Sequence, residues 1–86
     1  ILNLMNFTVY SKYGCPYCTK ILQVLNQLSV NKGYQITEYV LGTHFTREEF
    51  YSEFGEGSTF PQVVCGEAHL GGCSDTVKYL KEQNII

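Results

Sequence analysis

Charge and long apolar runs are both scarce in this chain of 86 residues. Only 16% of the residues are charged and the formal net charge is −2, so no basic field is available to hold nucleic acid or an acidic membrane surface. No apolar run approaches the roughly 18 to 20 residues that a membrane-spanning helix needs. The first residues, Ile1 to Met5, lack the basic and apolar stretches of a secretory signal. We therefore expect a single domain over residues 1–86 that binds neither nucleic acid nor membrane. Residues 1–5 are either a leading segment of the protein or an addition to its natural sequence.

Tryptophan is absent, but apolar residues in general are not scarce. Hydrophobic residues make up 44% of the chain and aromatic residues 14%, which argues against disorder, because disordered chains have few apolar residues and a high net charge. A chain of this length forms one domain with a small core.

The four cysteines are compatible with a disulfide scaffold, but the rest of the sequence disfavours one. Such scaffolds usually lack regular periodic segments, whereas periodic segments run throughout this chain. A single redox pair in a reducing cytoplasm fits the pattern better. We therefore expect a cytoplasmic protein.

The most informative segment is Cys15-Pro16-Tyr17-Cys18. It follows a short apolar strand pattern and opens a helical pattern, and a Cys-x-x-Cys at such a junction is typical of a thioredoxin-like redox motif. A thiol at a helix N-terminus faces unpaired backbone N–H groups and the positive end of the helix dipole. Both stabilise the thiolate, which is the nucleophile in disulfide exchange. Cys18 lies one helical turn further on, close enough to attack a mixed disulfide on Cys15.

The first half of the chain predicts two strands and two helices. Alternation predicts strands at 6–11 and 35–41. Apolar residues at helical spacing predict a helix from Tyr17 to about Val30, ended by Lys32-Gly33. Thr46, followed three residues later by Glu49, is a capping-box pattern and predicts a helix over 46–54.

The second half predicts a hairpin and a last helix. Strands are expected at 62–65 and 68–70, joined by a turn at 66–67. A helix is expected from Cys73 or Ser74 to about Asn84, with Val77 and Leu80 facing inward. The order is therefore β-α-β-α-β-β-α. Because a helical crossover makes the first two strands parallel and a tight turn makes the last two antiparallel, the fold class is α/β: a thioredoxin-like, four-stranded mixed sheet flanked by three helices that cover both of its faces.

Three motifs coincide along the chain: Lys12-x-x-Cys15-Pro16-Tyr17-Cys18, Thr59-Phe60-Pro61-Gln62-Val63 and Gly71-Gly72-Cys73-Ser74-Asp75. In this order and at these separations they resemble the glutaredoxin family, and the resemblance covers the chain from Asn6 onward. It implies a dithiol enzyme that reduces protein disulfides and protein–glutathione mixed disulfides. Glutathione would be a co-substrate, with no metal and no tightly bound cofactor. Phe60 departs from the family pattern, which usually has valine before the proline.

The resemblance also implies a role for each motif residue. Cys15 would be the nucleophile and Cys18 the resolving cysteine. Glutathione would bind in a groove formed by Lys12, Tyr17, Thr59, Phe60, Pro61, Gly72, Cys73, Ser74 and Asp75. Pro61 would follow a cis peptide bond and present the backbone of Phe60 to the cysteinyl part of glutathione. Residues 72–75 would hold its γ-glutamyl end at a helix N-terminus.

Several residues keep alternative interpretations. Ser74 and Asp75 also suit helix caps. Arg47 either reaches the glycyl carboxylate of glutathione or is a plain surface arginine. Cys65 is expected to pack in its strand, and no motif supports its pairing with Cys73. His44 and His69 are expected to be surface residues.

Three other functions compete with the leading one. A thioredoxin-type reductant driven by a flavoprotein reductase would share the fold, but thioredoxins typically have a tryptophan just before a Cys-Gly-Pro-Cys motif, and this chain has none. A carrier of a glutathione-ligated [2Fe–2S] cluster is disfavoured, by family resemblance, by the proline after the first cysteine. A zinc module would need a second Cys-x-x-Cys or paired histidines, which the spacing of Cys65 and Cys73 does not provide.

The expected partners follow from the resemblance. They are glutathione and proteins that carry a disulfide or a bound glutathione. Ribonucleotide reductase is a common partner in the family, although nothing in the sequence names it. A monomer is the simplest expectation.

Overall fold

The computed structural model describes residues 5–86. Its elements are β1 (Asn6–Ser11), α1 (Pro16–Lys32), β2 (Gln35–Val40), α2 (Arg47–Phe54), β3 (Gln62–Cys65), β4 (Ala68–Gly71) and α3 (Cys73–Glu82). All seven expected elements are present in the expected order, with ends displaced by no more than about two residues, the usual uncertainty of such boundaries. Of the expected leading segment, only Met5 belongs to the described residues. Within that range no helix combines the length and apolar character needed to cross a membrane.

The sheet is mixed, as the connections predict. The strand order is β2-β1-β3-β4. β1 runs parallel to β2 and antiparallel to β3, and β3 runs antiparallel to β4. β1 is thus a central strand, and the loop that follows it carries the Cys-x-x-Cys motif to one end of the sheet.

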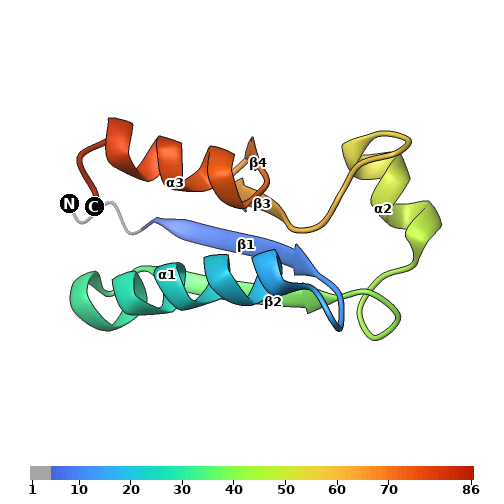
Figure 1. Ribbon diagram of the computed structural model, residues 1–86, viewed down its shortest axis with the longest axis horizontal. Helices are drawn as coiled ribbons and strands as arrows, with labels where there is room; N and C mark the ends of the chain where they lie inside the picture. The colour runs from blue at the N-terminus through green and yellow to red at the C-terminus, as the bar shows by residue number, and fades with distance from the viewer. Residues whose placement is uncertain (1–4) are drawn as a thin grey trace.

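The main core lies between the sheet and the pair α1 and α3. Alternate residues of β1, Phe7 and Val9, are fully buried, as strand geometry requires of the face turned to a core. They meet Ile21 and Leu25 of α1 and Leu80 of α3 in one cluster. Figure 1 shows α1 and α3 running alongside β1, both starting from the end of the sheet where β1 stops. The two helix N-termini are thereby brought to the same end of the molecule.

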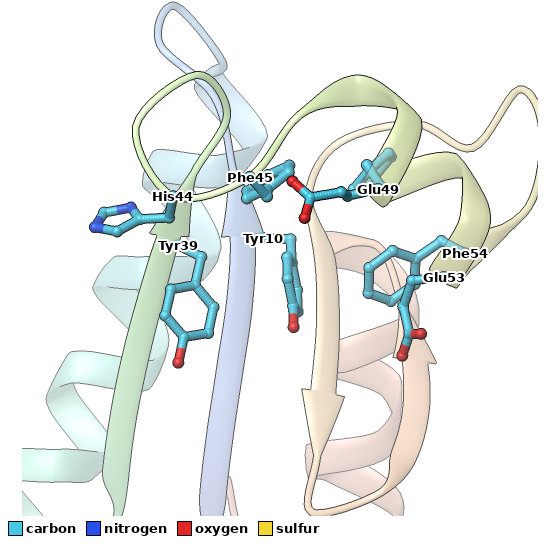
Figure 2. A pocket seen from close by; sticks show the side chains of 8 residues that line it. Tyr10, Tyr39, His44, Phe45, Glu49, Glu53 and Phe54 are labelled. Atoms are coloured by element: carbon cyan, nitrogen blue, oxygen red, sulfur yellow. The ribbon is translucent and has the colours of Figure 1, made fainter.

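The opposite face of the sheet is covered only at one end. α2 has eight residues, a length of about 12 Å, and lies beyond the end of β1 rather than along the sheet (Figure 1). Phe54 of α2 contacts Tyr10 with ring centroids 4.9 Å apart, and Tyr10 contacts Tyr39 at 5.5 Å. Figure 2 shows these rings on the face away from α1 and α3. They line a cavity of about 360 Å³. We expected helices to cover both faces of the sheet. On this face the expectation is correct only near α2, because so short a helix cannot extend across the strands.

Local signals set the helix ends where the sequence placed them. The Thr46 side chain accepts a hydrogen bond from the Glu49 N–H at 3.1 Å, and the Glu49 side chain accepts one from the Thr46 N–H at 2.8 Å. This reciprocal pair is the predicted capping box. Gly33 ends α1 at φ 74°, a left-handed conformation in which glycine has no steric penalty.

Candidate active site

Cys15 and Cys18 form a disulfide, with Cα atoms 5.2 Å apart. Cys15 is the N-cap residue of α1, in extended conformation, and Pro16 takes the first helical position, where a missing N–H costs no hydrogen bond. Cys15 is half-buried, whereas Cys18 is only 2% exposed. The sulfur that a substrate can reach is therefore that of Cys15.

The start of α1 is built to stabilise negative charge on Cys15. The Cys18 backbone N–H donates a hydrogen bond to Cys15 Sγ at 3.2 Å. Pro16 has no N–H, so the Tyr17 N–H is the other donor of the first turn without a partner in the helix, and the helix dipole adds positive potential at the same place. An N–H donor and a helix N-terminus both favour the thiolate form of a cysteine over the thiol, which suits Cys15 to nucleophilic attack once the disulfide is reduced.

Eight of the nine residues predicted to bind glutathione line one cavity of about 290 Å³. They come from the start of α1, the loop before β3 and the start of α3, and are Tyr17, Thr59, Phe60, Pro61, Gly72, Cys73, Ser74 and Asp75. We call this cavity the substrate groove. Lys12 does not line it, but its Nζ lies 5.3 Å from the centre of the Phe60 ring, a cation–π distance. Residues far apart in the sequence are thus brought together as the three motifs predict.

The peptide bond between Phe60 and Pro61 is cis, as predicted. Phe60, which stands where the family usually has valine, stacks on Phe50 of α2 at 4.1 Å and an interplanar angle of 9°. Its ring also stacks on Phe45, 6.2 Å away. The larger side chain therefore joins the aromatic cluster of α2, which explains how the chain accommodates the departure.

α3 begins without a side-chain cap. Gly72 is the N-cap residue and no side chain accepts a hydrogen bond from the first turn, so capping by Ser74 or Asp75 is not what the structure shows. Both side chains are exposed. The first N–H groups of α3 face the substrate groove with no helical partner, an arrangement suited to a carboxylate.

Two groove residues were missed by the sequence-based prediction, Gln62 and Gly71. Gln62 donates from Nε2 to the Thr59 carbonyl oxygen at 3.0 Å and so braces the loop. Gly71 has φ 104°, and a Cβ placed on it would lie 2.6 Å from Asp75 Oδ2. Only glycine lets the Asp75 carboxylate lie so close to β4. The available signal was the Gly71-Gly72 pair itself, which indicated a break but not a close approach.

Among the residues with alternative interpretations, Arg47 and the two histidines lie outside the substrate groove. Arg47 is exposed at the start of α2 and does not line the groove. His44 and His69 are exposed, as expected, but each has a partner. His44 Nδ1 accepts a hydrogen bond from the Val40 N–H at 2.9 Å, and His69 Nε2 lies 3.3 Å from Glu53 Oε1.

The two remaining cysteines, Cys65 and Cys73, are free thiols. Cys65 is half-buried in β3, as expected, and Cys73 is buried at the start of α3. Within residues 5–86 no group of three or more histidine, cysteine or acidic side chains is arranged to hold a metal ion.

Three side chains have a pKa raised above its ordinary value in the folded protein. Burial raises the pKa of the Cys65 thiol, and hydrogen bonding with Tyr79 offsets part of the rise. Burial also raises the pKa of the Tyr79 hydroxyl, with Cys65 adding to the effect. Burial again, followed by the charges of Glu53 and Tyr39, raises the pKa of Tyr10.

We therefore expect the oxidised protein to lose stability as the pH rises above about 9. In that range the unfolded chain releases protons that the folded chain still holds, so the free energy of unfolding falls. Urea unfolding at a series of pH values measures this free energy. The Cys65→Ala variant should show a shallower fall than the parent. A free energy of unfolding that stays constant or rises through this range would contradict the expectation.

Comparison with known proteins supports the assignment made from the motifs. Residues 7–70 match the model of the Glutaredoxin family. Glutaredoxin 1 of Rickettsia prowazekii is 33% identical over 82 residues, which cover 95% of this chain and 84% of that protein. Hybrid peroxiredoxin hyPrx5 of Haemophilus influenzae is 35% identical over 74 residues, which cover 86% of this chain but only 29% of that longer protein.

Solved structures share the fold at lower identity. Reduced Escherichia coli glutaredoxin superposes with a TM-score of 0.79 at 23% identity, over 94% of this chain and 99% of that one. The buckwheat glutaredoxin–glutathione complex superposes with a TM-score of 0.71 at 23% identity, over 90% of this chain and 69% of that one.

A thioredoxin-like sheet with a disulfide at the start of its first helix defines a thiol–disulfide oxidoreductase. Within that class the family match and the Rickettsia relative are decisive. The chain belongs to the glutaredoxin family.

Proposed function

We propose that this chain uses glutathione to reduce protein disulfides and protein–glutathione mixed disulfides through Cys15 and Cys18. The observation that carries the proposal is the substrate groove, which gathers at one end of the sheet eight residues predicted to bind glutathione. The groove includes Tyr17, the second residue of the helix that Cys15 caps. Glutaredoxins use glutathione as substrate, and the buckwheat relative forms a complex with it.

The chemistry is a sequence of thiol–disulfide exchanges. The Cys15 thiolate attacks the glutathione sulfur of a mixed disulfide, forms a Cys15–glutathione disulfide and releases the substrate thiolate, which takes a proton. A second glutathione thiolate then attacks the glutathione sulfur on Cys15. Oxidised glutathione leaves and the Cys15 thiolate is restored.

A protein disulfide takes the branch that uses Cys18. After Cys15 has attacked and one substrate thiol has left, the Cys18 thiolate attacks Cys15, frees the second substrate thiol and closes the disulfide of this structure. Two glutathiones reopen that disulfide in turn. Each cycle oxidises two glutathiones and reduces one protein disulfide.

The substrate groove offers a complementary partner to each end of glutathione. The free N–H groups at the start of α3 suit the carboxylate of the γ-glutamyl end, and the exposed Asp75 carboxylate suits its ammonium group. The backbone of Phe60, before the cis proline, suits the extended cysteinyl part. Lys12, held beside Phe60, supplies positive charge for the glycyl carboxylate.

A pair of coupled assays tests this function. The substrate is the mixed disulfide of glutathione and 2-mercaptoethanol. One assay supplies glutathione and its reductase, and the other supplies thioredoxin reductase. Turnover is expected only in the first. Turnover only in the second would assign the chain to the thioredoxin type of reductant and leave the groove residues as structural.

The cellular setting is also proposed, from the redox chemistry and the family resemblance. A reducing cytoplasm keeps the Cys15–Cys18 pair ready to act, and a monomer leaves the substrate groove open. Disulfide-bearing or glutathionylated proteins are the substrates, with ribonucleotide reductase as a candidate from the resemblance. Trapping with the Cys18→Ser variant, which cannot release a protein by closing its own disulfide, would identify them as mixed disulfides on Cys15.

A further inference from the structure

A second groove opens beside the substrate groove, between α1 and α3. It has a volume of about 590 Å³ and shares Tyr17, Cys73 and Ser74 with the substrate groove. Figure 1 shows the two helices running in the same direction away from the end of the sheet that carries Cys15. A chain whose sulfur reaches Cys15 can therefore continue along this groove.

The walls of this second groove are basic in an acidic protein. Lys20 of α1 and Lys78 and Lys81 of α3 line it, which are three of the six basic residues of a chain with a net charge of −2. All three side chains are exposed. Among the described residues none of them forms a salt bridge. Glu82 is the one carboxylate in the lining.

Three of the eight acidic residues lie away from this groove, on α2. α2 carries Glu48, Glu49 and Glu53, and the cavity under it, shown in Figure 2, is lined by Glu49 and Glu53. Three lysines that converge on one groove without partners favour an anionic occupant, because opposite charges across an interface steer association and fix its register.

The occupant is a protein rather than another polyanion, because the groove leads to a disulfide. Tyr13 precedes Cys15 by two residues and Tyr17 follows it by two, and these side chains are 81% and 62% exposed. Exposed aromatic side chains around a reactive centre are typical of surfaces that bind a partner protein.

We propose that the groove between α1 and α3 binds an acidic segment next to the disulfide or glutathionylated cysteine of a partner protein. This inference rests on the proposed function and adds a substrate preference to it. The helix rise places the three lysines about 6 to 12 Å from the starts of α1 and α3. An extended chain covers that distance in about two to four residues, so the acidic residues lie two to four positions from the partner's cysteine.

Two glutathionylated peptides test the preference. Each carries one cysteine, with glutamates two to four positions away on both sides in one peptide and glutamines at the same positions in the other. We expect kcat/KM for the glutamate peptide to be about tenfold higher at low ionic strength, and the advantage to shrink at high salt. The assay supplies glutathione and its reductase.

Lysine variants connect that preference to the groove. Replacing Lys20, Lys78 and Lys81 together by glutamine should remove the advantage of the glutamate peptide. The matched control is Lys32→Gln, which makes the same change on α1 but outside the groove and should keep the advantage. A fourth protein, Lys20→Gln, completes the set. The parent and all three variants should turn over the 2-mercaptoethanol–glutathione disulfide at the same rate.

Each other outcome has a distinct meaning. Equal rates for the two peptides in the parent protein, or an advantage that survives in the triple variant, would overturn the proposal. Binding to vesicles of anionic phospholipid through these lysines, without a peptide preference, would overturn it in favour of a membrane surface. Failure to turn over the small mixed disulfide with glutathione would instead count against the proposed function itself.

Discussion

The Cys15→Ser variant is expected to lose glutathione-dependent turnover entirely, down to the rate of the uncatalysed exchange. Cys15 is the more accessible cysteine of the pair. Its sulfur accepts a hydrogen bond from the Cys18 N–H and lies at the N-terminus of α1. A serine hydroxyl in that position does not ionise near neutral pH and cannot form the mixed disulfide. The measurement is the coupled assay with the 2-mercaptoethanol–glutathione disulfide.

The Cys18→Ser variant is the matched comparison, because it removes the other sulfur of the same disulfide. Cys18 is 2% exposed and acts only on a substrate already bound to Cys15. We expect this variant to keep its activity on glutathione mixed disulfides, which a second glutathione resolves, and to lose activity on protein disulfides. Residual turnover in Cys15→Ser would show that the nucleophile is wrongly assigned. Equal loss in both variants would rule out direct resolution by glutathione.

The Gly71→Ala variant is expected to weaken both the fold and the substrate groove. Alanine at φ 104° is strained, and its Cβ would lie 2.6 Å from Asp75 Oδ2. The strain alone costs about 1–2 kcal/mol of stability. Relief of the contact displaces the Asp75 carboxylate from the groove, and KM for the small mixed disulfide should rise about tenfold, the scale of one lost hydrogen bond to a charged group.

The control for this prediction is Gly42→Ala. Gly42 has φ 88°, but a Cβ there would meet nothing within 4 Å, so the variant reports backbone strain alone. It should lose stability and keep its KM. The double variant Gly71→Ala, Asp75→Ala removes the 2.6 Å contact with Oδ2 but keeps the Asp75 Cβ, 3.1 Å from the added methyl group. It should therefore recover part of the stability that Gly71→Ala loses relative to Gly42→Ala, but not the KM. A Gly71→Ala variant with unchanged KM would separate Asp75 from glutathione binding.

The fold was largely predictable from local signals. The capping box at Thr46 and Glu49, the left-handed glycine at Gly33 and the alternation of β1 depend on neighbours within a few residues, and all three appear where expected. The coverage of the sheet was not predictable in the same way. The short length of α2 was predicted, but the end of the sheet that it covers depends on the contacts of Phe50 with Phe45 and Phe60, and periodicity within α2 carries no information about them.

The candidate site likewise contains residues that the sequence predicted and residues that it did not. The Cys-x-x-Cys pair was named from its own chemistry, and the residues around Pro61 and Gly72 were named through the resemblance to the glutaredoxin family, which three runs of adjacent residues carry. Gln62 braces the loop through a carbonyl three residues away, and Gly71 matters because Asp75 folds back onto it. These are contacts of particular atoms, which the identity of the residues alone does not specify.

The sequence by itself determined the order of the elements, the redox pair and the family. Helix caps, strand alternation and a Cys-x-x-Cys at a helix start are local properties and are written in consecutive residues. Only the tertiary structure decided that Lys20 on α1 and Lys78 and Lys81 on α3 line one groove beside Cys15, and that the acidic side chains of α2 lie elsewhere. These lysines, about sixty positions apart in the sequence, line the same groove because α1 and α3 pack side by side on the sheet. Net charge and composition do not depend on where residues lie in space, so they cannot indicate such a cluster.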